Sequence, residues 1–137
     1  MKLSLSRDLE EISRIVAATH SWFAAQEVSD SLLFPVDLAT EELFVNMIRH
    51  NPSKPDKITL EMDTVEHGVS VQLTDYDVER FDPRSAPVPD ISAPASERRI
   101  GGLGLHLVAN VVTALDYDYR NRTSTVRFIA LENDHRV

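Results

Sequence analysis

The sequence predicts an α+β fold, a two-layer α/β sandwich in which three helices cover a mixed, mostly antiparallel sheet. Two kinds of periodicity support this prediction. Apolar residues recur at helical spacing over 8–26 and 36–50, and an apolar run after a glycine cluster predicts a third helix over 103–113. Five shorter stretches alternate apolar and polar residues, as half-buried strands do: 2–6, 58–63, 69–74, 115–119 and 124–131.

The composition is that of an ordinary globular protein and argues against several functional classes. Of the 137 residues, 42% are hydrophobic and 26% are charged, which predicts a single domain over 1–137 with a real core. The net charge of −8 argues against non-specific nucleic-acid binding, which needs a basic surface. The chain has no cysteine and no apolar run long enough for a membrane span. Its N-terminus becomes polar too early for a signal peptide, so we expect a cytoplasmic protein.

Local signals set the expected boundaries of these elements. The first helix should begin at Asp8, where Glu11 three residues later completes a capping box. The second helix should end at His50, because a proline at position 52 disfavours helical conformation in the residue before it. Gly68 in a short connection predicts a hairpin between the second and third strands.

The second helix carries a polar stripe. Apolar side chains cover most of its circumference, so the helix should be buried. Glu42, Asn46 and His50 are spaced by four residues and therefore lie on one face. Because burying such groups unpaired is costly, they should face water, a ligand or hydrogen-bond partners. A carboxylate, an amide and an imidazole one turn apart are suited to holding a hydrated metal ion and activating a nucleophile. The alternative is a face that simply points to solvent.

Three of the four glycines gather at the start of the predicted third helix, at Gly101, Gly102 and Gly104. Without Cβ atoms the backbone can approach a ligand closely, and the free N–H groups of a helix's first turn favour an anion such as phosphate. The preceding loop, about 79–100, is rich in proline and lacks periodicity, so we interpret it as a lid over that ligand. The alternatives are a flexible turn that caps a core helix, and a disordered insertion.

Several of these stretches resemble motifs of one superfamily. The run from Glu42 to His50, Glu-Leu-Phe-Val-Asn-Met-Ile-Arg-His, resembles the N-box of the GHKL ATPases, which include DNA gyrase and the histidine kinases. It is most similar to the branch of anti-sigma factor serine kinases. Phe81-Asp82-Pro83 also resembles that branch, as does the run from Arg99 to Val108, which is similar to the glycine box that closes the ATP lid. The order and spacing of these motifs cover nearly the whole chain.

The resemblance implies a Bergerat ATP-binding fold, the histidine kinase-like ATPase fold, with ATP and Mg²⁺ as cofactors. Asn46 would hold Mg²⁺ bridging the ATP phosphates, and Glu42 would be the general base for a target serine. His50 would line the phosphate side, and Asp75 would bind the adenine amino group. Backbone N–H groups at the glycine box would bind the phosphates, and either Arg98 or Arg99 would add positive charge. That group comprises Arg99, Gly101, Gly102, Leu103 and Gly104.

The same resemblance implies an ATP-dependent protein serine kinase that is also an anti-sigma factor. The protein would bind a sigma factor or another regulator. It would phosphorylate a STAS-type anti-sigma factor antagonist and so switch between partners. Relatives also imply a homodimer. Neither nucleic acid nor a membrane is an expected partner.

One stretch departs from the family pattern. After Asp75 the family has glycines, whereas this chain has Asp77 and Glu79, and Phe81 follows one residue later than in the family. The adenine-binding residue is therefore either Asp75 or Asp77. The missing glycines remove a close backbone approach, and two extra carboxylates repel phosphate. A second hypothesis is therefore a non-catalytic partner-binding module that holds nucleotide weakly or not at all. A third is an enzyme of phosphate metabolites that uses the same glycine turn.

Overall fold

The computed structural model describes residues 1–52, 55–85 and 102–132 of the chain. The helices are α1 (Glu11–Gln26), α2 (Leu33–His50) and α3 (Gly102–Val111). Short 3-10 helices at Asp30–Leu32 and Pro83–Ser85 precede α2 and follow the third strand. The strands are β1 (Lys2–Leu5), β2 (Ile58–Val65), β3 (Gly68–Asp75), β4 (Ala114–Arg120) and β5 (Thr123–Leu131).

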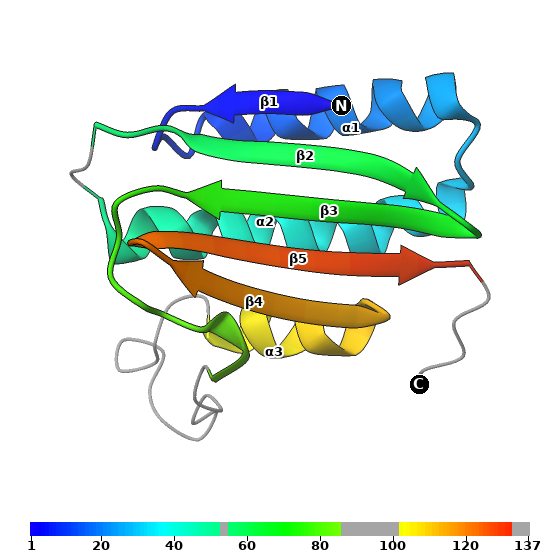
Figure 1. The fold of residues 1–137 in the computed structure, drawn as a ribbon. Helices are drawn as coiled ribbons and strands as arrows, with labels where there is room; N and C mark the ends of the chain where they lie inside the picture. Colours follow the sequence, from blue (N-terminus) through cyan, green and yellow to red (C-terminus); the bar gives the residue numbers. More distant parts are fainter. Residues whose placement is uncertain (53–54, 86–101, 133–137) are drawn as a thin grey trace, which may run out of the picture.

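The five strands form one open sheet in the order β1-β2-β3-β5-β4. All three helices lie on the same face of this sheet, and the other face carries no helix from the described residues (Figure 1). The predicted two-layer α+β fold is therefore confirmed. The sequence also predicted that some strand pairing would be parallel, but all four pairings among the described residues are antiparallel.

Both long helices begin at different residues from those predicted. α1 begins at Glu11, because the carboxylate of Asp8 accepts the N–H of Glu10 in a turn, and the capping box between Asp8 and Glu11 does not form. α2 begins at Leu33, three residues early, because Pro35 fits in a first turn, where its missing N–H leaves no helical bond unmade. Within the described ranges, no helix is long and apolar enough to cross a membrane.

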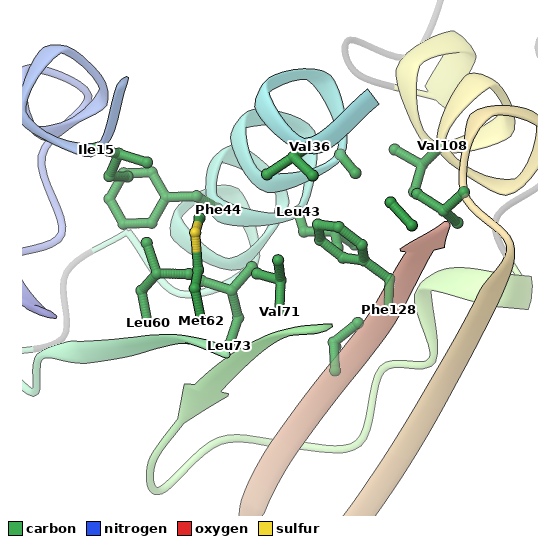
Figure 2. Packing of buried hydrophobic residues seen from close by; sticks show 14 of the residues in the cluster. Ile15, Val36, Leu43, Phe44, Leu60, Met62, Val71, Leu73, Val108 and Phe128 are labelled. Carbon is green, nitrogen blue, oxygen red and sulfur yellow. The ribbon is translucent and has the colours of Figure 1, made fainter. Parts of the chain in front are cut away.

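The core lies between the helix layer and the covered face of the sheet. α2 packs over the central strands, with Val36, Leu43 and Phe44 directed toward the sheet (Figure 2). Opposite them lie buried side chains from three strands: Leu60, Met62, Val71, Leu73 and Phe128. Because this face of α2 is buried, the rotation of the helix about its axis is fixed. The directions of its polar residues are then fixed as well.

Gly68 is not the turn residue that the sequence suggested. It is the first residue of β3 and pairs with Val65, so the turn consists of Glu66 and His67, with His67 at a φ of 65°. A Cβ atom on Gly68 would lie 2.1 Å from the carbonyl oxygen of Ala130 in β5. Gly68 is therefore needed for the close approach of β3 to β5 and not for the turn.

We expect Gly68→Ala to lower the free energy of unfolding by about 2 kcal/mol, because the backbone of β5 must move to admit the methyl group. Urea unfolding followed by circular dichroism measures the change. Thr64→Ala, at an exposed position of the same hairpin, is the control and should change stability by less than about 0.5 kcal/mol. Equal stability of Gly68→Ala and the wild type would contradict the close-packing explanation.

Candidate functional site

The polar stripe of α2 is present, and its three residues differ in burial. Asn46 is 7% exposed, Glu42 is half-buried and His50 is exposed at the end of the helix. Neither Glu42 nor Asn46 has a side-chain hydrogen bond to any residue that the structure describes. The fold therefore leaves a carboxylate and an amide on one helix face without using their polar atoms in hydrogen bonds to described residues or in helix capping.

A cavity is lined by residues at the end of α2, at and after the end of β3, and at the start of β5. These three ends lie at the same end of the sheet (Figure 1). The cavity lining brings together Asn46 and His50 from α2 with Asp75 from β3, and Glu79 lies beside them. The rest of the lining is largely apolar, from side chains that include Leu43, Met47, Val78, Phe81 and Val126. Apolar side chains beside converging polar groups are typical of a small-molecule site.

Glu42 lies one turn before Asn46 on α2, next to the cavity lining and not within it. Burial raises the pKa of the Glu42 carboxyl, and the neighbouring charge of Glu41 raises it further, while the positive charge of Arg49 partly offsets both. A carboxylate whose pKa is raised is a stronger proton acceptor than an ordinary one. Glu42 therefore has the electrostatic character of a general base.

Asp75 is the last residue of β3 and is 2% exposed. Its two carboxylate oxygens accept hydrogen bonds from Arg7, with Nη1–Oδ1 at 2.7 Å and Nη2–Oδ2 at 3.1 Å. Arg7 also donates to the carbonyl oxygens of Met47 and Asn51 at the end of α2. The sequence alone does not identify Arg7, because a single arginine after a short strand carries no local signal. Only the tertiary structure brings it to Asp75.

The structure distinguishes the two aspartates that the sequence left as alternatives. Asp75 lines the cavity, whereas the side chain of Asp77 is 69% exposed and pairs with Arg122 at 2.7 Å. Asp77 has a φ of 54°, a conformation that glycine adopts most easily and that aspartate tolerates better than most residues. Asp77 therefore holds a left-handed conformation at a position where glycine is favoured. Of the two aspartates, Asp75 is the one that lines the cavity.

Two tyrosines of β4 hold the segment that follows β3. The hydroxyl of Tyr119 donates to the carbonyl oxygen of Val78 at 2.6 Å, and the hydroxyl of Tyr117 accepts the N–H of Phe81 at 3.2 Å. The guanidinium of Arg80 lies 5.7 Å and 6.0 Å from the centroids of the two tyrosine rings. These contacts position the backbone of Phe81 beside the cavity.

The ring of Phe81 stacks on the imidazole of His50, with ring centroids 3.7 Å apart and an angle of 33° between the planes. The space that remains is a cavity of about 20 Å³, which has room for about one water molecule. The polar groups of the site are therefore assembled, but the Phe81–His50 stack narrows it. A ligand as large as a nucleobase therefore needs a wider cavity than this one.

Asp82 follows Phe81 in the chain and does not line the cavity. Its contacts are with the short segment that comes after the Phe81–His50 stack. Its carboxylate accepts hydrogen bonds from the guanidinium of Arg84, which lower the pKa of Asp82, and from the N–H of Arg84. The 3-10 turn Pro83–Ser85 begins directly after it. Asp82 thus stays ionised and stabilises this turn.

The structure describes only some of the residues that are predicted to bind phosphate. Gly102, Leu103 and Gly104 form the first turn of α3, where backbone N–H groups are free of helical bonds. Arg99, Gly101 and the proline-rich part of the expected lid, 86–101, lie outside the described residues. The first turn of α3 thus presents the kind of N–H groups that phosphate binding needs.

The donor set fits a nucleotide with Mg²⁺. The side chain of Asn46 supplies an amide oxygen, a ligand that Mg²⁺ accepts, and Asp75 supplies an acceptor for an amino group. In the part of the chain that the structure describes, no group of three or more His, Asp or Glu side chains is placed to hold a metal ion by itself. Mg²⁺ would therefore need phosphate oxygens as further ligands, which is how it is usually bound beside nucleotides.

Comparisons with known proteins identify the family and the fold of the chain. Residues 5–130 match a family model described as the histidine kinase-like ATPase domain. No curated protein matches the chain. Among solved structures, a chain in the crystal structure of the SiaB-SiaC complex from Pseudomonas aeruginosa is similar, with a TM-score of 0.64 and 15% sequence identity. The alignment covers 94% of this chain and 88% of that chain, and at this identity it shows the fold alone.

Proposed function

Because the chain belongs to the family of histidine kinase-like ATPase domains, we propose that it binds Mg-ATP and phosphorylates a serine of a partner protein. The partner is a STAS-type anti-sigma factor antagonist, and the protein itself is an anti-sigma factor that binds a sigma factor or another regulator. The similar structure supports action on a protein, because its chain belongs to a complex of two proteins. The motifs from Glu42 to His50 and from Arg99 to Val108 support the kinase branch.

One observation carries this proposal. Asn46 and Asp75 line the same cavity although they come from different elements, and Glu42 lies one turn from Asn46 on the same helix face. Asp75 would bind the adenine amino group, and Asn46 would hold Mg²⁺ at the phosphates. The first turn of α3, with Gly102 and Gly104, would donate N–H groups to phosphate oxygens.

In the proposed reaction Glu42 accepts the proton of the target serine hydroxyl as the serine oxygen attacks the γ-phosphorus of ATP. The bond from that phosphorus to the oxygen it shares with the β-phosphorus breaks, and ADP leaves. Mg-ATP supplies the phosphoryl group and the cation that neutralises its charge. The chain's own contribution is positioning, a proton acceptor and hydrogen-bond donors at the phosphates.

The second candidate is a non-catalytic partner-binding module of the same fold. Two observations favour it. The carboxylate-bearing Glu79 lines the cavity, where its charge would repel phosphate, and the Phe81–His50 stack leaves only about 20 Å³. Such a module would bind its partner with nucleotide weakly held or absent.

Calorimetry with Mg-ATP separates the two candidates. We expect the wild type to bind with a micromolar dissociation constant and Asn46→Ala to bind at least about tenfold more weakly, because it lacks the amide that holds Mg²⁺. Gln72→Ala, on the open face of the sheet, is the control and should bind as the wild type does. Absence of heat at millimolar Mg-ATP would rule out the kinase and support the binding module.

A further inference from the structure

Asp75 lines the cavity, and Arg7 forms an ion pair with it from outside the lining. Both side chains are 3% exposed. One guanidinium binds both carboxylate oxygens, at 2.7 Å and 3.1 Å. Within residues 1–52, 55–85 and 102–132, all other arginines are exposed. A buried pair in which each partner satisfies the other holds both side chains in one geometry.

The remaining contacts of Arg7 anchor it to a second element. Its Nε donates to the carbonyl oxygen of Asn51 at 2.8 Å, and Nη2 donates to that of Met47 at 2.7 Å. Both carbonyls belong to the C-terminal end of α2, where a positive charge is favourable. The guanidinium therefore cannot turn away from Asp75 without losing its bonds to α2.

This geometry limits how Asp75 can bind a ligand. A carboxylate has about four acceptor positions, two that point in parallel away from the chain and two that diverge at the flanks. The two-pronged contact with Arg7 occupies the parallel pair. Asp75 also lines the cavity, so a donor on a ligand there can use only a flank position, and no ligand can place two parallel donors on both oxygens.

We propose that Arg7 determines the base specificity of this site by restricting Asp75 to a single hydrogen bond from the nucleobase. Adenine presents one donor on its pairing edge, the exocyclic amino group. Guanine presents two parallel donors, a ring N–H and an amino group, which is the pattern that a free carboxylate binds best. Arg7 thereby selects adenine over guanine. This inference rests on the nucleotide binding proposed above.

The variant Arg7→Lys tests the inference, because lysine keeps the positive charge but cannot bind both oxygens as a fork. Calorimetry compares Mg-ADP with Mg-GDP for the wild type, Arg7→Lys and the control Arg14→Lys, whose arginine is exposed beside Glu11. We expect the wild type and Arg14→Lys to prefer ADP, and Arg7→Lys to lose about tenfold of that preference. An unchanged preference in folded Arg7→Lys overturns the inference and leaves nucleotide binding intact. A wild type that binds neither nucleotide overturns both.

If circular dichroism shows that Arg7→Lys does not fold, the unmodified protein provides the test. Nitrogen-15 NMR follows the side-chain N–H signals of Arg7 while Mg-ADP is added. We expect these signals to remain protected from solvent exchange, because Asp75 keeps Arg7 bound while its flank receives the amino group. Loss of protection in the ADP complex would show that the base displaces Arg7 and would overturn the inference.

Discussion

Glu42→Gln is expected to lower the rate of phosphoryl transfer by about 100-fold or more, because the amide cannot accept the serine proton. The measurement is transfer of labelled phosphate from ATP to the cognate antagonist, with Mg-ATP affinity measured in parallel. Affinity and fold should be retained, since Glu42 lies outside the cavity lining and has no hydrogen bond to a described residue. Glu41→Gln, which removes the neighbouring exposed carboxylate, is the control and should transfer phosphate at nearly the wild-type rate.

Retained phosphoryl transfer in Glu42→Gln would exclude this residue as the base. The pH dependence of the wild-type rate is a second test of the same role. Only ionised Glu42 accepts a proton, so the rate falls as the pH drops through its pKa. Burial raises this pKa, so the acidic limb should lie above the ordinary value of 4.5. Arg49→Met removes a positive charge that lowers the pKa, so the limb should move to higher pH; a move to lower pH would contradict the assignment.

Phe44→Ala is expected to lower the free energy of unfolding by about 3–5 kcal/mol, because it empties a fully buried site between α2 and the sheet. Urea or thermal unfolding measures the loss. Phe34→Ala on the same helix is a matched control, since the Phe34 side chain is 68% exposed, and its stability should change by less than about 0.5 kcal/mol. Equal losses in the two variants would show that α2 is not packed as Figure 2 shows.

These two experiments address opposite faces of one helix. Phe44 contributes to the stability of the fold through packing, whereas Glu42 is expected to affect the rate of phosphoryl transfer. The raised pKa of Glu42 means that folding disfavours its charge, so Glu42→Gln should not destabilise the protein at neutral pH. Measuring activity and stability in both variants therefore separates a lost base from a lost fold.

The sequence predicted the elements of the fold more reliably than their ends. Among the elements that the structure describes, periodicity identified α1, α2 and the five strands, because burial on one face imposes it along each segment. The apolar run after the glycines identified α3. The start of α1 was wrong because Asp8 bonds to the N–H of Glu10 and does not cap the helix. Gly68 was misassigned to a turn, because the requirement for glycine at this position comes from another strand: a side chain there would clash with the carbonyl oxygen of Ala130.

By itself the sequence determined the layered fold, the alignment of Glu42, Asn46 and His50 on one helix face, and the glycine-rich start of α3. Each of these depends on residues within a few turns of one another, where spacing alone sets direction. Only the tertiary structure decided that Asp75 lines the cavity and that Arg7, 68 residues away, binds it. The contact of Phe81 with His50 was decided in the same way. Such contacts join distant parts of the chain through packing, so the spacing of residues within one segment cannot predict them.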